Sequence, residues 1–293
     1  MSRAQAASVG GFWRDPAVWM ALPAAAFMLL VFVYPFLDGL RLSLMPADGG
    51  GLLGNYRKFF DTPSQWSTIA TTMKLALPAT LINVGIAVPL AYRLRHKTRY
   101  QKVATTVITI PLTLGTVLIA EGMLTYFGPR GWFSQAVAAL HLVNGPVHLT
   151  HNYWGVLISL VISGFPFAFL LILSYVTGID PGLARAAATL GASPARQFRY
   201  IVLPLLAPGL AMTFCLSFVQ AFSVFPSAVL LGAPAGPTRV ISIAAYEAAF
   251  ENYDYSMASS IAMIMGAVQL AVVVTVLALR GLAYRGPATG GKG

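Results

Sequence analysis

The sequence predicts an all-α protein that crosses a membrane six times. First, 57% of its 293 residues are hydrophobic and only 10% are charged, with a mean hydropathy of +0.72. A soluble protein carries roughly 25% charged residues, so this composition indicates an integral membrane protein. Second, six apolar segments approach the ~20 residues that a helix needs to cross a bilayer. Third, basic residues concentrate in alternate connections between these segments, as membrane topology requires.

The first of the six expected spans is too long to be the apolar core of a signal peptide. No small-residue cleavage site follows it, so we expect it to remain as an anchor. The second span is polar at its outer end, where Lys74 lies. After the third, apolar residues recur with helical spacing over 131–141 and predict a helix along the outer surface. These spans are Ala17–Leu44, Ser67–Tyr92 and Val103–Phe127.

The fifth expected span contains the only cysteine of the chain, Cys215. A single cysteine excludes an intramolecular disulfide. The connection before the sixth span carries Glu247, Glu251 and Asp254. These acids could dock a solute-binding protein, or they could simply be solvated, as most charged loops are. The fourth, fifth and sixth spans are Trp154–Val176, Leu205–Leu231 and Met257–Leu279.

The basic residues predict which connections face the cytoplasm. If the N-terminus lies inside, the inner segments hold 13 of the 19 lysines and arginines, whereas seven of the nine acids lie outside. Both termini are therefore expected in the cytoplasm. Residues 1–16 form the N-terminal segment, 17–280 the six-helix transmembrane domain and 281–293 the tail. The net charge of +10 reflects this topology and needs no nucleic-acid partner.

The connection between the fourth and fifth spans, residues 179–204, is the most informative segment. An alanine-rich helical turn is followed by Gly191, which lets two short helices meet at an angle that a residue with a Cβ disfavours. In the second turn Phe198 shares a helical face with apolar residues three and four positions further on. Arg196 and Arg199 flank it. A large aromatic side chain with basic neighbours suits an apolar groove rimmed by acids.

This segment resembles the cytoplasmic "EAA" loop of permease subunits in ATP-binding-cassette (ABC) importers. The resemblance implies the six-helix type I (MetI-like) permease architecture. It also implies that the loop docks on a separate ATPase, whose motion switches the spans between inward and outward access. The loop residues concerned are Arg185, Ala186, Ala187, Gly191, Ala192, Arg196, Phe198, Arg199, Leu203 and Pro204.

The same resemblance implies the partners and the location. A permease of this kind works with a second permease, here expected to be a paralogue, with two cytoplasmic ATPase subunits and with an extracytoplasmic solute-binding protein. It lies in the bacterial inner membrane, needs no cofactor and is not an enzyme, because ATP hydrolysis takes place on the partner chain.

Two positions in the loop depart from the family pattern. Arg185 stands where the family has glutamate, and Thr189 stands where many relatives have aspartate. These changes put in doubt any salt bridge normally made there. The alternative interpretation of the segment is a lipid-facing interfacial helix.

The substrate branch is suggested by Leu190–Ser193 and by the region from the fifth to the sixth span. Both resemble permeases of the spermidine/putrescine type, which implies a small polar solute of the polyamine class. Permeases for sulfate, thiamine, iron and aminophosphonate are alternatives in the same branch. Relatives often carry an acid midway along the fifth span, but residues 212–231 contain none, and Gln220 is their only amide.

Polar groups within the spans are the candidates for a translocation path. Ser217, Gln220 and Ser223 could line it together with Phe222 and Phe225. Glu121 could attract a cation, although we expect it, like Asp38 in the first span, to pair with a basic residue at the interface.

Other functional classes find little support. The tail sequence GPATGGK begins a phosphate-binding loop but lacks the required Ser or Thr and any following helix. The three histidines between residues 141 and 151 have no cysteine or carboxylate to complete a zinc set, so no metal site is expected. An ion-coupled secondary transporter would show inverted repeats and buried ionisable residues, and the sequence shows neither clearly.

Overall fold

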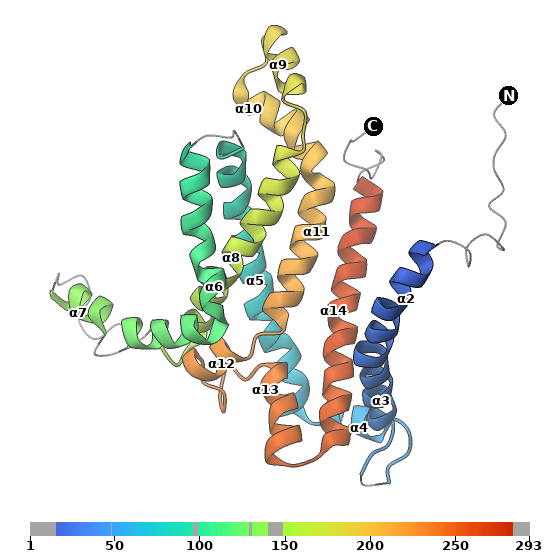
Figure 1. The fold of residues 1–293 in the computed structure, drawn as a ribbon. Helices are drawn as coiled ribbons and strands as arrows, with labels where there is room; N and C mark the ends of the chain where they lie inside the picture. Colours follow the sequence, from blue (N-terminus) through green and yellow to red (C-terminus); the bar gives the residue numbers. More distant parts are fainter. Residues whose placement is uncertain (1–15, 48, 96–98, 129–130, 140–148, 284–293) are drawn as a thin grey trace.

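The computed structural model describes residues 16–47, 49–95, 99–128, 131–139 and 149–283. The long helices run side by side between two ends, which we call the hairpin end, where α9 and α10 project, and the loop end, where α4, α7, α12 and α13 gather (Figure 1). In the described part, six helices are long and apolar enough to cross a membrane, as predicted. The expectations for the N-terminal segment, the tail and most of the histidine-bearing loop fall largely or wholly outside the described residues.

The first span is a continuous helix with a wider turn at its middle. It comprises α2 (Pro16–Met28), the π-helical η1 (Leu29–Val33) and α3 (Tyr34–Ser43). The backbone N–H of Tyr34 donates to Leu29, five residues back. The next residue is Pro35, which has no N–H and whose ring would clash with the carbonyl four residues earlier. The π turn accommodates this proline without breaking the helix.

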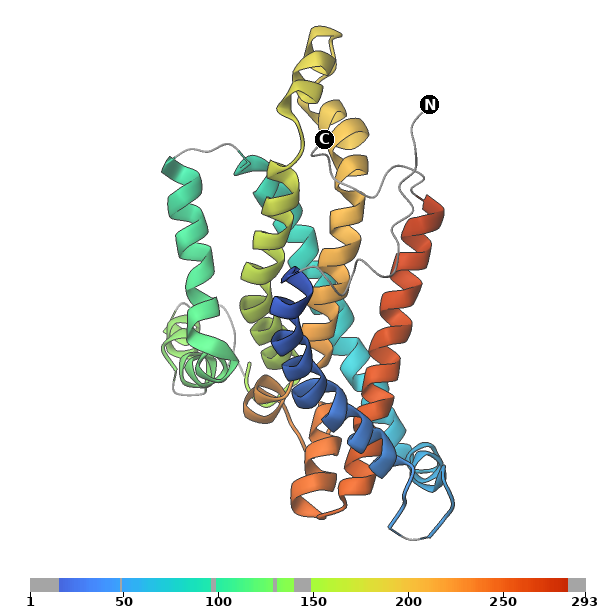
Figure 2. The same ribbon diagram turned by 45° about the vertical axis from the view of Figure 1, so that its right-hand side comes forward.

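The core of the bundle is formed by the second, fourth and fifth spans. α8 (Tyr153–Thr177) packs against α5 (Pro63–Arg93), α6 and α11 (Leu203–Phe222). Of the most apolar window of α8, 61% is buried, against 11% in α14 (Tyr255–Ala283). α14 lies between α11 and α3, at the edge of the bundle (Figures 1 and 2). The outer helices therefore present their apolar side chains to lipid or to another subunit.

The third predicted span is not a single straight crossing. α6 (Arg99–Phe127) breaks at Gly115, whose φ of +72° and ψ of 163° are non-helical. Such a conformation favours glycine because it has no Cβ, and Pro111 weakens the preceding turn. The second half of α6 runs across the loop end toward α7 (Trp132–Ala139), which corresponds to the predicted surface helix (Figure 1).

The predicted bounds of the fifth span, 205–231, are wrong at both ends. The helix begins at Pro194, continues through α10 (Pro194–Gln197) and η2 (Phe198–Val202) and ends with α11 at Phe222. A separate α12 (Pro226–Leu231) follows. Phe225 precedes a proline, where the α-helical region is disfavoured, and its φ of −132° and ψ of −60° end the helical path. Residues 223–227 are therefore free to line a cavity.

The loop end is fastened by an arginine that bridges two segments distant in sequence. Arg239 donates to the Glu247 carboxylate (Nε–Oε2 3.0 Å) and, through Nη1, to the Ser64 carbonyl at the start of α5 (2.8 Å). This joins α5 to α13 (Ile241–Tyr246) and η3 (Glu247–Glu251). α4 (Gly54–Asp61) completes this end.

Two of the three acids that could have formed a docking surface or a solvated loop are thus used within the chain. Glu247 pairs with Arg239, and Asp254 caps α14 by accepting from the backbone N–H of Met257 at 2.9 Å. Glu251 alone remains exposed without an ion pair among the described residues. The acidic loop is therefore mainly structural.

Replacing Arg239 by methionine is expected to destabilise the protein by about 2 kcal/mol. Removing one partner of a fully buried pair costs roughly 3–5 kcal/mol, and the cost here is lower because the Arg239 and Glu247 side chains remain 20% and 25% exposed. The measurement is the thermal unfolding midpoint in detergent. Arg57→Met is the control, because Arg57 and Asp61 are 86% and 71% exposed, and no measurable change is expected. Equal shifts for both variants would show that the loop-end bridge is not structural.

Candidate coupling hairpin and membrane cavity

The hairpin between α8 and α11 has a local sequence signal for each of its turns. α9 (Pro181–Thr189) begins after Asp180, whose carboxylate accepts from the Gly182 N–H at 2.8 Å. Proline at the first helical position lacks only an N–H that would have no partner there. An N-cap aspartate followed by proline therefore fixes the start of α9.

The end of α9 and the start of α10 occupy five consecutive residues, Leu190–Pro194. Gly191 has a φ of +81°, and two backbone bonds of 3.0 Å close the helix: Gly191 N–H to Ala188 and Ala192 N–H to Ala187. This is the Schellman arrangement, which favours glycine. Ser193 then caps α10 by accepting from the Arg196 N–H at 3.4 Å. The predicted role of Gly191 as the residue that turns the chain is confirmed.

The tip of the hairpin lies beyond the ends of the long helices (Figure 1) and exposes apolar side chains. Leu190 is 88% exposed and Leu183 is 45% exposed. Ala186 and Leu190 follow Leu183 by three and seven positions, so the three side chains lie on one face of α9 and its C-terminal end. We call Leu183, Ala186 and Leu190 the tip face. The sequence analysis missed it, although the i, i+3, i+7 spacing was available.

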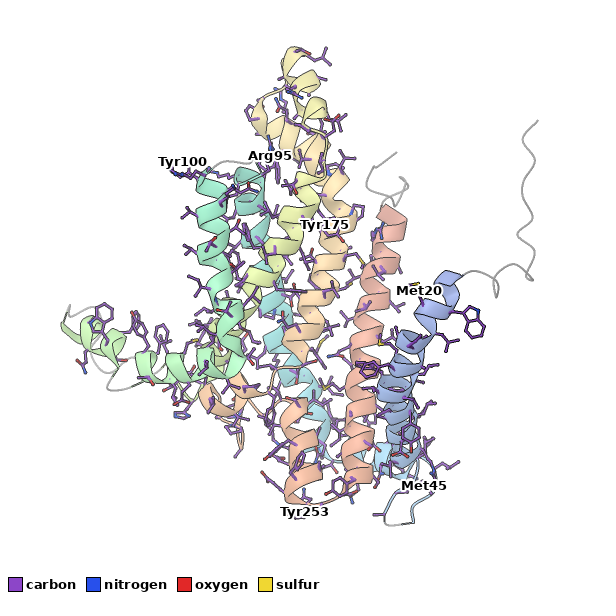
Figure 3. The ribbon with its side chains drawn as sticks, in the orientation of Figure 1. Met20, Met45, Arg95, Tyr100, Tyr175 and Tyr253 are labelled. Carbon is purple, nitrogen blue, oxygen red and sulfur yellow. The ribbon has the colours of Figure 1, made fainter. Side chains whose placement is uncertain are left out.

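Phe198 lies at the foot of the hairpin rather than at its tip. It is half-buried, and its ring centroid lies 4.7 Å from that of Tyr92 in α5. The Arg95 guanidinium lies 3.9 Å from the Tyr92 ring centroid (Figure 3). Phe198 thus anchors the hairpin to α5. It does not project as the expected plug.

The other predicted loop residues are either exposed or partly covered, and none of those described below is buried. Arg185, Ala186, Arg196, Arg199 and Pro204 are exposed, and Arg185 makes no ion pair among the described residues. Ala187, Ala192 and Leu203 are partly covered.

A cavity of about 280 Å³ lies within the bundle, between α5, α8, α11 and the turn after α11. It brings together four of the predicted path residues, Ser217, Gln220, Ser223 and Phe225. Hydroxyl and amide groups that the sequence analysis did not select join them. These are Asn83, Thr116, Ser163 and Ser227. On α5 the polar residues 68, 72, 80 and 83 recur with helical spacing, a signal that could have identified Asn83.

Two polar atoms of the cavity lining are buried without a hydrogen-bond partner. Asn83 is 2% exposed; its Nδ2 donates to the Leu160 carbonyl at 3.3 Å, but its Oδ1 has no partner. Ser217 is 3% exposed, and its Oγ has none either. By contrast, Ser227 pairs with Ser159 at 2.8 Å. An unpaired buried polar group costs roughly 1–3 kcal/mol, so these two atoms are suited to a ligand.

Two predicted path residues lie elsewhere. Phe222 is fully buried in the core, with its ring centroid 5.5 Å from that of Phe218. Glu121 is exposed on the second half of α6, after the break at Gly115, and only Thr116 of that half lines the cavity. Neither Glu121 nor Asp38 forms an ion pair among the described residues, so the expected interfacial pairing is not observed there; Arg130 lies outside them.

No cluster of three potential metal ligands occurs among the residues that the structure describes.

Comparison with known proteins places these features in a wider group. Residues 83–282 match the family model described as "Binding-protein-dependent transport system inner membrane component". The match begins at Asn83 and includes the hairpin, the cavity and the last span.

Curated relatives transport different solutes. A probable sulfate transport system permease protein of Prototheca wickerhamii is 28% identical, with 71% of this chain and 78% of the relative covered. A trehalose transport system permease protein of Mycobacterium tuberculosis is 26% identical over 95% and 93%. A spermidine/putrescine transport system permease protein of Haemophilus influenzae is 25% identical over 71% and 76%.

The fold matches that of a solved importer. A bacterial alginate ABC transporter, crystallised in complex with its alginate pentasaccharide-bound periplasmic protein, contains a chain with a TM-score of 0.78 at 20% identity. The match covers 91% of this chain and 94% of that one. The all-α, six-helix architecture of the MetI-like type is therefore confirmed.

Proposed function

The chain belongs to the family of binding-protein-dependent transport system inner membrane components, and from this premise we propose that it carries a polar solute through the cavity beside Ser217 when a partner ATPase moves its hairpin. It is a multi-pass permease subunit of an ABC importer and not an enzyme, since its relatives are named as transport permeases. Importers of this kind combine permeases with an ATPase and a solute-binding protein.

The observation that carries the proposal is the exposed tip face at the end of a rigidly built hairpin. The Leu190 side chain is apolar and 88% exposed, so it contributes almost nothing to packing within this chain. Apolar side chains at such a position, close to the exposed Arg185, suit a hydrophobic groove with acidic edges on another protein. The tip face is therefore the surface proposed to enter the ATPase.

The second support is the mechanical path from the hairpin to the cavity. Residues 194–222 form one uninterrupted helical run, with Arg196 near its start and Ser217 near its end. Helical residues rise 1.5 Å each, so about 30 Å separates these two residues. The Phe198–Tyr92 contact ties the same run to α5, whose Asn83 also lines the cavity. A displacement of the hairpin would thus move two walls of the cavity.

This proposal fixes the topology and the partners. The hairpin end, with the last residues of α14, faces the cytoplasm of a bacterial cell, so both termini are cytoplasmic. The chain assembles with a second permease, a paralogue, with two ATPase subunits and with an extracytoplasmic binding protein. The loop-end helices α4, α12 and α13 face that binding protein.

The class of solute that the chain transports is a separate and more specific part of the proposal. The polyamine class expected from the loop is one of several among the relatives, which also include sulfate and sugar permeases. It remains a prediction from resemblance. No ionisable side chain occurs among the described residues that line the cavity, which also gives an ion-coupled mechanism no site.

The proposal is tested by co-purifying the full chain with its ATPase and comparing Gly191→Val. The φ of +81° strains a β-branched residue by at least about 1–2 kcal/mol, while no atom lies within 4 Å of the added Cβ. We expect a roughly tenfold weaker complex, together with a lowering of the unfolding midpoint by a few degrees that the control variant shares. Gly51→Val is the matched control, with a φ of +79°, equally open space and a position at the loop end. If wild type itself binds no ATPase, the proposed coupling role is wrong.

A further inference from the structure

We infer that the central cavity binds an uncharged, polyhydroxylated solute, a saccharide, rather than a polyamine or an inorganic anion. The inference rests on the proposed transport function and specifies its substrate class. It is carried by the unpaired atoms of Asn83 and Ser217 and by the absence of charge among the described lining residues.

Asn83 requires a hydrogen-bond donor from the ligand. Its amide orientation is set by the protein, because Nδ2 donates to the Leu160 carbonyl, which leaves Oδ1 as a buried acceptor without a partner in a residue that lines the cavity. A fully ionised oxyanion such as sulfate has no proton to donate to it. The Ser217 hydroxyl is unpaired as well and can both donate and accept. A ligand hydroxyl group satisfies either residue.

The lining disfavours a cation for a different reason. A polyamine would lose the hydration of its ammonium groups on entering the cavity, and burial of an unpaired charge is costly. The described lining offers Asn83, Gln220 and hydroxyl groups but no carboxylate to compensate. The volume of about 280 Å³ is near the lower limit of small-molecule sites, roughly 300 Å³. It suits a small saccharide or one end of a longer one.

A second cavity, which shares Phe225 with the central one, is lined by aromatic rings that suit a sugar. Phe225 lines the central cavity and also a second cavity of about 530 Å³ at the loop end. There its ring centroid lies 5.1 Å from that of Tyr246, which lies 5.0 Å from that of Phe250. The negative faces of such rings attract the C–H groups of a sugar ring. They also attract cations, so it is the uncharged central cavity that discriminates between the two.

The test uses the complete importer in proteoliposomes, with uptake of trehalose, maltose, spermidine and sulfate measured in parallel. ATP hydrolysis that depends on this chain is measured in the same vesicles. We expect ATP-driven uptake of a sugar and none of spermidine or sulfate. Uptake of either ion, or no sugar uptake by vesicles with permease-dependent ATP hydrolysis, overturns the inference but leaves the proposed coupling intact. Absence of permease-dependent hydrolysis refutes the coupling instead, and with it the inference that rests on it.

Substitutions of cavity residues test whether the cavity itself determines sugar uptake. Ser217→Ala removes an unpaired hydroxyl and is expected to lower sugar uptake about tenfold at limiting substrate. Thr213→Val is the matched control, because Thr213 lies one turn away on α11 and is equally buried and unpaired but does not line the cavity. Asn83→Asp should lower sugar uptake, whereas for a cationic substrate the new carboxylate would raise it. Equal loss in Ser217→Ala and Thr213→Val, or a gain in Asn83→Asp, contradicts a saccharide site.

Discussion

Replacing Leu190 by aspartate is expected to abolish association of the chain with its ATPase while the membrane bundle stays folded. The Leu190 side chain is 88% exposed, so the change removes almost no contact within the chain. In the proposed complex it would remove roughly 1.5–3 kcal/mol of apolar burial. It would also bury an unpaired carboxylate against a groove that we expect to be acidic at its rim. A loss of affinity of at least a hundredfold follows.

The measurement is co-purification of the full chain with the ATPase, followed by titration of the complex. Leu52→Asp is the matched control, since Leu52 is 71% exposed but lies at the loop end. Thermal unfolding of both variants should equal that of wild type. If Leu190→Asp binds the ATPase as wild type does, the tip face is not the docking surface, and the interfacial-helix alternative regains support.

Replacing Gly209 by leucine is expected to have the largest effect on folding. Tyr175 lies on α8 (Figure 3). Gly209 of α11 lies against its ring, and a Cβ at position 209 would come within 2.6 Å of the Tyr175 Cδ2. The atoms it meets are at the root of the ring, so the ring must leave its site. Overpacking of this kind costs about 3 kcal/mol at the upper end of its range.

This close approach also has a functional consequence. α8 and α11 are the two spans that flank the hairpin and contact each other, so in the proposed mechanism their close packing lets the hairpin move them together. Gly209→Leu should therefore lower both the unfolding midpoint and ATP-driven transport. Gly266→Leu is the control, because Gly266 lies within a membrane span with nothing within 4 Å of an added Cβ. Adding Tyr175→Ala to Gly209→Leu should recover part of the lost stability, and no recovery would show that the ring is not the obstacle.

Much of the fold could be predicted because its signals are local. Apolar length gave the six spans, and the fourth, Trp154–Val176, agrees within a residue at each end with α8. In the hairpin, Asp180, Gly191 and Ser193 act on backbone groups within five residues of themselves. Such capping depends on sequence alone, so the position of the turn could be read before the structure was known.

The errors have an equally physical origin. Residues Leu205–Leu231 were predicted as one span because the segment as a whole is apolar enough. Hydropathy carries no information on backbone angles, so it does not reveal that Phe225, which precedes Pro226, leaves the helical region. Gly115 was treated as an ordinary residue of a span, yet its positive φ breaks α6 before Glu121, which does not line the cavity. Both errors concern a few backbone angles that composition does not reveal.

The sequence by itself determined the six apolar spans and the capped hairpin before the fifth, because apolar length and capping residues act locally; the hairpin's likeness to ABC permeases came from resemblance to that family. Only the tertiary structure decided that Phe198 anchors the hairpin to Tyr92 while Leu190 remains exposed. It also decided that Asn83 and Ser217, 134 residues apart, line one cavity, with the Asn83 Oδ1 and the Ser217 Oγ unpaired. These relations depend on how α5, α8 and α11 pack, and that packing is set by contacts between residues distant in the chain, which no local pattern encodes.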